Sequence, residues 1–308
     1  MPGNVTLSIE LELGWGMHDM SECGHLSPER STESATLNWL LGLCNEYKIP
    51  ISFDVVGHLL LDECTGNHEG PHPRNWWSAD PGTNADEDPL FYAPEMISKI
   101  AEQPVDHEIC THTFSHMLAG EMDDEVLADE LRMSREVFAN AGYAEPVSIV
   151  LPRHQPASST VLQENGIKTI RTPFEWSGRF GKLKNWGRWL LRHPIGRPKR
   201  EDNLVRTFCT PFPSLASIWL PQGNGIQPPL PAQFLPLAAR KRWHERYLTS
   251  AIDRAADRKM SVHLWSHLFN ITNRAQRSPI SACIKYMASR RDEGAVEIRR
   301  MCDLPGAV

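Results

Sequence analysis

Short apolar segments alternate with helical segments along the first 171 residues, and this succession restricts the chain to few folds. Residues 5–12 alternate apolar and polar side chains strictly, so Glu10 and Glu12 share one face of a predicted strand. A helix is predicted over 31–47, and a mostly apolar strand is predicted over 51–57. This strand–helix–strand order favours an α/β fold with a mainly parallel sheet or barrel.

The same succession continues along the rest of the chain. Further strands are predicted over 107–111, 147–151, 167–171 and 261–265. Further helices are predicted over 92–102, 123–140, 158–164, 238–257 and 280–291. Polar and proline-rich stretches at about 63–90 and 175–236 are predicted to be loop insertions. We therefore expect a single domain over residues 1–308.

Composition excludes several classes of protein. A net charge of −6 argues against a dedicated nucleic-acid binder, and no run of about 18 apolar residues predicts a transmembrane helix. The first residues carry no basic segment followed by an apolar one, so no signal peptide is expected. The seven cysteines include no C-x-x-C pair, which is typical of reduced thiols. These features together predict a cytoplasmic protein.

Histidine pairs mark the candidate chemistry. The chain contains three pairs at a spacing of four residues: His68/His72, His112/His116 and His263/His267. The first pair lies in a Gly- and Pro-rich loop, and His263 lies inside a strand, where a wall histidine is expected. His112 and His116 directly follow a predicted strand, and in parallel α/β folds chemistry lies at such strand ends. They are therefore the better candidate for a metal-binding pair.

Several of these segments together resemble the polysaccharide deacetylases, the carbohydrate esterase family 4 enzymes that share the NodB-homology domain. Residues 112–116 read H-T-F-S-H, similar to the family motif H-[ST]-x-x-H. Residues 51–57 resemble the strand after the family's first helix. Arg153 follows Leu151-Pro152 as in the third motif, and His267 ends a late strand. The resemblance spans about 5–270 and implies a distorted (β/α)7 barrel.

The first family motif is altered in this chain. The family reads T-F-D-D, with a catalytic base and then a metal ligand, whereas residues 8–11 are Ser-Ile-Glu-Leu. Glu10 takes the base position, and Leu11 cannot bind metal. Glu12 shares the face of Glu10 and is therefore predicted to be the third ligand. Asp54 is a rival ligand, unless it pairs with Arg153 or another arginine as a structural salt bridge.

The resemblance implies a metal-dependent hydrolase that removes an acetyl group from an aminosugar or a glycan precursor. Its site would hold a divalent metal, with zinc expected, on Glu12, His112 and His116. Catalytic roles fall to Glu10 as the base, His267 as the acid, and Arg153 as the group that orients the base. Two alternatives remain: a metal-independent cyclic-amide (ureide) hydrolase of the same superfamily, and a non-catalytic carbohydrate-binding pseudoenzyme.

Charge is distributed unevenly along the chain. Residues 1–140 contain 6 basic and 26 acidic side chains, whereas residues 141–308 contain 26 basic and 12 acidic ones. Because the motif series crosses residue 140, we interpret the two halves as opposite sides of one cleft. The basic, Trp-bearing segment 182–200 suggests an anionic partner, namely a nucleotide- or lipid-linked N-acetylated sugar or an anionic membrane surface.

Overall fold

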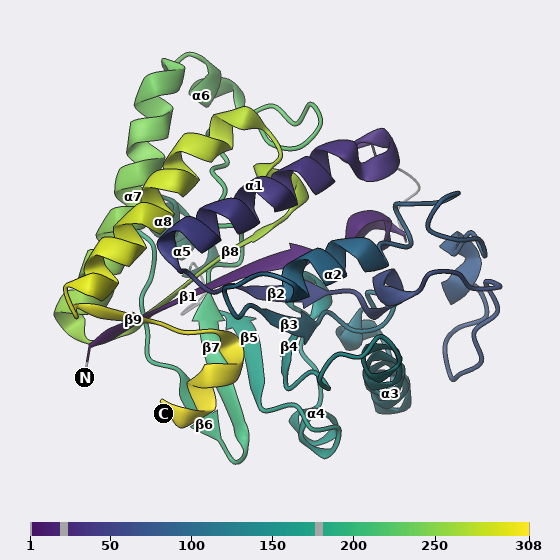
Figure 1. The fold of residues 1–308 in the computed structure, drawn as a ribbon. Helices are drawn as coiled ribbons and strands as arrows, with labels where there is room; N and C mark the ends of the chain where they lie inside the picture. Colours follow the sequence, from purple (N-terminus) through teal and green to yellow (C-terminus); the bar gives the residue numbers. More distant parts are fainter. Residues whose placement is uncertain (1, 19–23, 176–180, 308) are drawn as a thin grey trace.

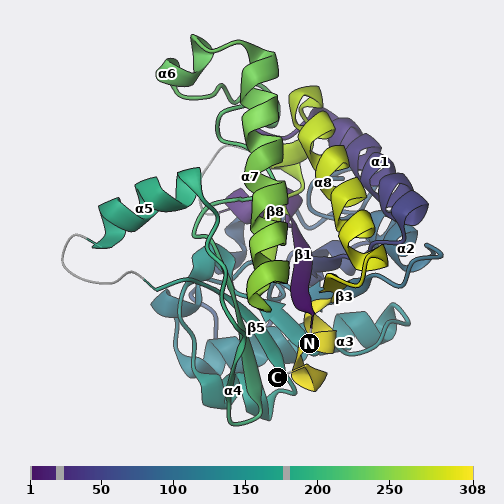
Figure 2. The same cartoon turned by 90° about the vertical axis from the view of Figure 1, so that its left-hand side faces the viewer.

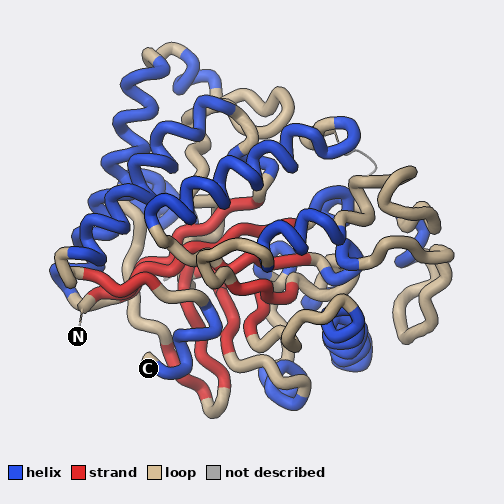
Figure 3. The backbone as a smooth tube through the Cα atoms, in the orientation of Figure 1, coloured by secondary structure: helices blue, strands red, loops and turns tan. Residues whose placement is uncertain are grey.

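A nine-stranded, mainly parallel sheet forms the centre of the computed structural model, which describes residues 2–18, 24–175 and 181–307. The strands are β1 (Gly3–Leu11), β2 (Ser52–Val55), β3 (Glu108–Thr111), β4 (Ser148–Val150), β5 (Thr169–Pro173), β6 (Lys199–Glu201), β7 (Leu204–Cys209), β8 (Ser261–His267) and β9 (Val296–Ile298). Their order is β6-β7-β5-β4-β3-β2-β1-β8, with β9 also paired to β1. Figure 3 shows the strands gathered at the centre of the molecule. Only the β6–β7 pair is antiparallel. The predicted α/β class is confirmed.

Helices cover the outer side of the sheet (Figures 1 and 2). They are α1 (Ser31–Tyr47), α2 (Pro94–Ala101), α3 (Asp124–Asn140), α4 (Ser159–Glu164), α5 (Gly181–Leu191), α6 (Leu230–Gln233), α7 (Leu237–Arg258) and α8 (Arg274–Asp292). Contacts link α7 to α8, α8 to α1, α1 to α2, and α3 to α4. No helix in the described part of the chain is both long and apolar enough to cross a bilayer.

The sheet curls into a half-barrel, so its two ends approach each other. His263 on β8 lies with its Nδ1 3.2 Å from the hydroxyl of Thr207 on β7 and its Nε2 3.0 Å from the hydroxyl of Ser8 on β1. His263 is buried, and burial lowers its pKa well below the ordinary value. The predicted wall histidine is thereby confirmed. The distorted barrel expected from the sequence is present as this curled, open sheet.

Both faces of β1 are buried, but they meet different surroundings. Val5, Leu7, Ile9 and Leu11 belong to the main hydrophobic core, which also contains residues of α1, α7 and α8. Glu10, on the alternate face, is only 4% exposed and points toward the interior of the half-barrel. The period of two in residues 5–12 therefore separates the packing face from the face that carries the chemistry.

The segment 175–236 differs from the predicted loop insertion. It contains α5, β6, β7 and α6, and β7 pairs with β5 in the main sheet. β6 is exposed and polar throughout, so it lacks the apolar alternation that marks a buried strand. Helix α8 also begins earlier than predicted, at Arg274. Asn273 caps this helix and Pro279 lies inside it, and that proline is an ordinary helix-stop signal.

Residues 61–90 form a long connection at one side of the molecule (Figure 1, blue segment at the right). The connection follows the short 3-10 helix Gly57–Leu60 and contains one further 3-10 helix, Trp76–Ala79. An isolated bridge between Glu63 and Asn84 closes its base. The loop expected at 63–90 is thus present. It has little regular backbone structure, but its side chains make several buried polar contacts.

Candidate active site

Three of the predicted metal ligands converge at the ends of β1 and β3. Oε2 of Glu12 lies 3.1 Å from Nε2 of His116 and 3.5 Å from Nε2 of His112. One ligand atom from each of these residues falls within 4.8 Å of the other two, and all three residues are buried. Two imidazoles and one carboxylate leave a fourth position open on a tetrahedral ion. The structure thus brings together the three residues that the sequence offers as ligands.

The His112 ring fits a metal ligand in its hydrogen bonding. Its Nδ1–H donates to the carbonyl of Val150 at 2.8 Å, which leaves Nε2 as the bare nitrogen facing Glu12. That Nε2 is buried and has no hydrogen-bond partner in the described part of the chain. A ligating histidine commonly has its second nitrogen held by a carbonyl in this way. The residues present therefore fit a divalent metal.

A buried carboxylate shapes the turn that carries His116. Glu130 of α3 accepts hydrogen bonds from the backbone N–H groups of Phe114 at 2.7 Å and Ser115 at 2.8 Å. The turn needs this support because Thr113 and His116 both adopt left-handed backbone conformations, with φ of 63° and 60°. Glu130 thus presents His116 to Glu12, a role that the helical pattern of 123–140 did not reveal.

Glu10 and His267 form the second half of the site. Nε2 of His267 lies 2.9 Å from Oε2 of Glu10 and 3.7 Å from Oε1 of Glu12. The Nδ1–H of His267 donates to Oδ1 of Asn270 at 2.7 Å. Burial alone would lower the pKa of His267, but the charges of Glu10 and Glu12 raise it to about 9. His267 therefore holds its proton at neutral pH.

Both carboxyl groups are held ionised despite their burial. Burial opposes ionisation of Glu10, but the charges of His267 and Arg171 bring its pKa well below the ordinary value. Burial likewise opposes ionisation of Glu12, but the charge of His267 and the nearby rings of His112 and His116 lower its pKa well below the ordinary value. An ionised Glu10 can accept a proton, and an ionised Glu12 can bind a cation.

The arginine that contacts Glu10 is Arg171, not the predicted Arg153. The guanidinium of Arg171 pairs with Oε1 of Glu10 from β5, across the interior of the half-barrel. Arg153 lies in a 3-10 turn after β4, with a φ of 51°, and its side chain is exposed. The base-orienting role assigned to Arg153 is corrected on this ground. Arg171 ends a predicted strand, so the rule that chemistry lies at strand ends could have identified it.

Asp54 takes the structural alternative that the sequence left open. Its Oδ2 lies 3.1 Å from Nη1 of Arg171, and its Oδ1 accepts the thiol of Cys110 at 2.9 Å. Burial raises the pKa of Asp54 to about 7. Asp54 belongs to neither ligand group that includes Glu12 among the described residues. The salt bridge therefore explains this buried carboxylate, and Glu12 is the better third ligand.

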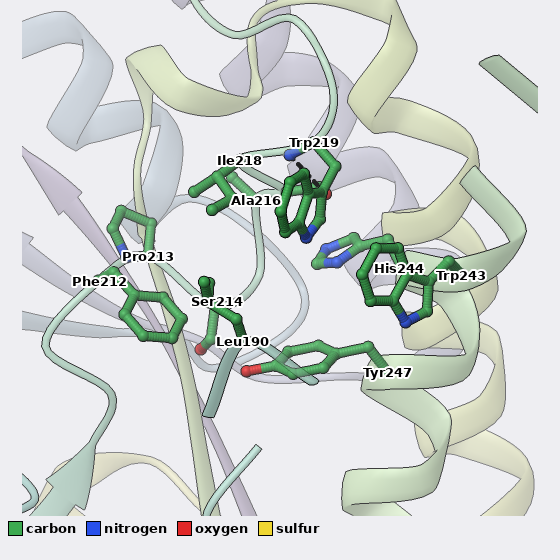
Figure 4. A pocket seen from close by; sticks show the side chains of 11 residues that line it. Leu190, Phe212, Pro213, Ser214, Ala216, Ile218, Trp219, Trp243, His244 and Tyr247 are labelled. Atoms are coloured by element: carbon green, nitrogen blue, oxygen red, sulfur yellow. Dashed lines mark hydrogen bonds between the residues drawn. The ribbon is translucent and has the colours of Figure 1, made fainter. Parts of the chain in front are cut away.

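A small aromatic pocket lies beside the end of β8 (Figure 4). Trp219 and Trp243 stack there with ring centroids 5.3 Å apart, and Tyr247 lines the floor. Ser214 joins the pocket to β8, because its backbone N–H donates to the carbonyl of Trp265 at 2.9 Å. The cavity volume of about 20 Å³ suits one water molecule.

A comparison with known protein families matches the part of the chain that carries two of the site residues. A family model for polysaccharide deacetylases matches residues 30–170. This confirms the resemblance to the polysaccharide deacetylase family. The matched segment includes His112 and His116, whereas Glu10, Glu12, Arg171 and His267 lie outside it, so their roles rest on the geometry above. No curated protein is similar enough to the sequence to give a match.

Solved structures support the fold. A protein described as a polysaccharide deacetylase from Mycobacterium smegmatis superposes with a TM-score of 0.63 at 16% identity, over 99% of this chain and 89% of its own. A similarly described protein from Pseudomonas aeruginosa gives 0.60 at 13% identity, over 98% and 89%. An allantoinase gives 0.57 at 12% identity, also over 98% and 89%. At these identities the likeness establishes the deacetylase-like barrel fold and no particular activity.

Proposed function

We propose that the chain is a metal-dependent hydrolase that releases acetate from an N-acetylated aminosugar. The observation that carries this proposal is the convergence of Glu12, His112 and His116 next to an ionised Glu10 and a protonated His267. Glu12, His112 and His116 would hold a divalent metal, and zinc suits two imidazoles with one carboxylate. Such a metal supplies a water of lowered pKa and polarises the acetyl carbonyl.

Glu10 acts as the base in this proposal. Its Oε2 takes the proton from the attacking water, while its Oε1 remains paired with Arg171. Arg171 is a positioning residue, because its guanidinium also holds Asp54 and Ser8 and is over 98% buried. A base held in this way keeps one orientation, and the reaction depends on that orientation.

His267 acts as the acid. The carbon–nitrogen bond of the amide breaks as Nε2–H of His267 donates its proton to the departing amine, which leaves acetate and a free amino group. The hydrogen bond from Nδ1–H to Asn270 fixes the ring, and the amide of Asn270 in turn donates to Oε1 of Gln222 at 2.9 Å. His267 is 22% exposed at its side chain, which places it toward the incoming substrate.

The substrate would carry a negative charge near helix α5. Basic side chains in and after this helix are exposed, including Lys184, Arg188 and Arg192. Trp186 of the same helix is also exposed, and Figure 2 shows α5 projecting from the body of the molecule. We assign this surface to the phosphate of a nucleotide- or lipid-linked sugar. Reversal of these three charges should raise KM for such a sugar and leave an unlinked sugar unaffected.

The experiment measures acetate released from a panel of N-acetylated sugars by the native chain, by chelator-treated protein and by His112→Ala. We expect acetate release to depend on zinc. We expect His112→Ala to abolish it, because Nε2 of His112 is a ligand atom in this proposal. Release of acetate that survives chelation would contradict the metal site. Ring opening of a cyclic ureide by chelated protein would favour the ureide hydrolase, and sugar binding without turnover would favour a pseudoenzyme.

A further inference from the structure

Four metal-ligating side chains converge outside the active site, in the segment 58–80. Nε2 of His58 lies 3.1 Å from Oδ2 of Asp80, and Nε2 of His68 lies 2.7 Å from the same oxygen. The Sγ of Cys64 lies 3.6 Å from Nε2 of His58 and 3.7 Å from Nε2 of His68. All four ligand atoms lie within 4.8 Å of one another.

The separations that involve the sulfur suit a tetrahedral ion. Zinc bonds of about 2.0–2.1 Å to nitrogen and about 2.3 Å to sulfur give tetrahedral edges of about 3.3–3.6 Å. The nitrogen–sulfur separations of 3.6 and 3.7 Å are close to those edges, whereas the nitrogen–oxygen separations of 3.1 and 2.7 Å are shorter and would lengthen when an ion binds. Side chains of His58 and Asp80 are fully buried and that of His68 is 10% exposed, so the group encloses its centre.

The ring of His58 has the hydrogen bonding of a metal ligand. Its Nδ1 lies 3.2 Å from the backbone carbonyl of Phe91, which can only accept, so Nδ1 carries the proton. In the neutral ring, Nε2 then presents a lone pair to the carboxylate of Asp80. Two lone pairs at 3.1 Å need a cation between them, or else a buried imidazolium.

The other ligands are supported by groups around them. Asp80 turns Oδ2 toward the two histidines, while its Oδ1 accepts the hydroxyl of Tyr92 at 2.8 Å and the backbone N–H of Gly82 at 3.0 Å. The Sγ of Cys64 accepts the backbone N–H of Gly66 at 3.3 Å. Such contacts orient metal ligands and stabilise a thiolate. They hold the four ligand atoms around one common centre.

We propose that His58, Cys64, His68 and Asp80 form a second, closed zinc site. Thiolate and imidazole ligands favour zinc over magnesium or calcium, and four protein ligands with no open position are typical of a structural ion. The metal-free explanation would require His58 to be an imidazolium in a fully buried place, while a neutral His68 donates from its Nε2 to the same carboxylate. A single dication with two anionic and two neutral ligands balances the charge instead.

The site would fasten the long 61–90 connection to the wall of the active site. In the same connection, the indole N–H of Trp76 donates to the hydroxyl of Ser115 at 2.7 Å. Nε2 of His72 lies 2.7 Å from Oε1 of Glu130, the carboxylate that supports the turn bearing His116. A connection with so little regular backbone structure needs such a clip to keep these contacts in place.

Access to the ion comes from an adjoining surface cavity of about 870 Å³. Its lining includes Cys64 and His68 but neither His58 nor Asp80, so the ion would enter from the side of the connection. This cavity lies away from the catalytic residues, none of which lines it.

The experiment measures zinc and cobalt in the full chain. Native protein should hold about two zinc ions, and both Cys64→Ala and His112→Ala should hold about one. Replacement by cobalt should give a thiolate-to-cobalt charge-transfer band, which only a cysteine ligand produces. Cys64→Ala should remove that band, whereas Cys302→Ala, a matched change at another partly buried cysteine, should retain it.

The readouts separate this proposal from the proposed function. Absence of a thiolate-to-cobalt band in the cobalt-loaded native protein would overturn the second site even if acetate release is zinc-dependent. This measurement uses the native chain, so it does not depend on the folding of any variant. A thiolate band with no acetate release on any substrate would leave the second site standing and count against the hydrolase. Unchanged zinc content in Cys64→Ala would also overturn the second site.

Discussion

Replacing Arg171 by methionine tests the corrected assignment of the positioning arginine. Nη1 of Arg171 donates to the hydroxyl of Ser8 at 2.6 Å and to Asp54 at 3.1 Å, and Nη2 pairs with Glu10. The guanidinium also lies 4.4 Å from the ring centroid of Trp265. Methionine retains an apolar chain of similar length but removes every one of these donors, so it leaves Asp54 buried without its cation and Glu10 paired with His267 alone.

The size of the effect follows from this burial. Removing one partner of a buried ion pair costs about 3–5 kcal/mol, because the remaining charge is uncompensated. We therefore expect Arg171→Met to lower the free energy of unfolding by about 3–5 kcal/mol near pH 8. Arg153→Met is the matched control, and at that exposed position a change of at most about 1 kcal/mol is expected.

The dependence on pH gives a second check on the same variant. Burial already raises the pKa of Asp54 to about 7 in the folded chain, and loss of the Arg171 charge would raise it further. Raised carboxyl pKa values in the folded state reduce stability as pH increases, so the loss should be larger near pH 8 than near pH 6. Replacing Asp54 by Asn in the Arg171→Met background should recover part of the stability.

Urea unfolding followed by tryptophan fluorescence measures both quantities. The m-value should be unchanged, so that a lower midpoint reports lower stability. The reasoning would be refuted if Arg171→Met unfolded within about 1 kcal/mol of the native chain, or if Arg153→Met were equally damaging. Acetate release should follow the same order, with Arg171→Met nearly inactive while it retains its metal.

Three further outcomes are expected. His267→Gln should reduce acetate release by about 10²–10⁴-fold with zinc content unchanged, and equal loss of zinc would assign it to the ligand set instead. Gly16→Ala should weaken active-site zinc binding in a competition titration, because its Cβ would lie 2.4 Å from Cδ of Glu12; unaltered affinity would contradict this crowding. Burial lowers the pKa values of His193 and His244 to about 4, so the free energy of unfolding should decrease as the pH is lowered from about 6.5 to about 4, by up to roughly 3 kcal/mol per histidine. Urea midpoints that stay constant over this pH range would contradict it.

Residues whose role follows from local pattern were predictable. The alternation in 5–12 identified Glu10 and Glu12 as neighbours on one face, and the position of His112 and His116 after a strand placed them at the rim. The charge imbalance between the two halves of the chain also has a counterpart in the structure. One site joins carboxylates from the acidic half to Arg171 and His267 from the basic half.

Contacts that depend on long-range packing were not predictable. The rule about strand ends could have placed Arg171 among the candidate residues, but its contact with Glu10 depends on how far the sheet curls, which no local pattern reports. The spacing of four in His68/His72 carried no information, since His68 turns to Asp80 and His72 turns to Glu130. Cys64, four residues before His68, was the available signal for the second cluster. Its partners His58 and Asp80 depend on how the connection folds.

Anomalous diffraction at the zinc edge from zinc-loaded crystals tests the central claim most directly, because it locates the ion of the hydrolytic site. We predict a peak bonded to Oε2 of Glu12 and to Nε2 of His112 and His116, with Glu10 and His267 adjacent and unbonded. The account would be contradicted if zinc-saturated crystals showed no peak among these three residues, or if Asp54 replaced Glu12 as the ligand.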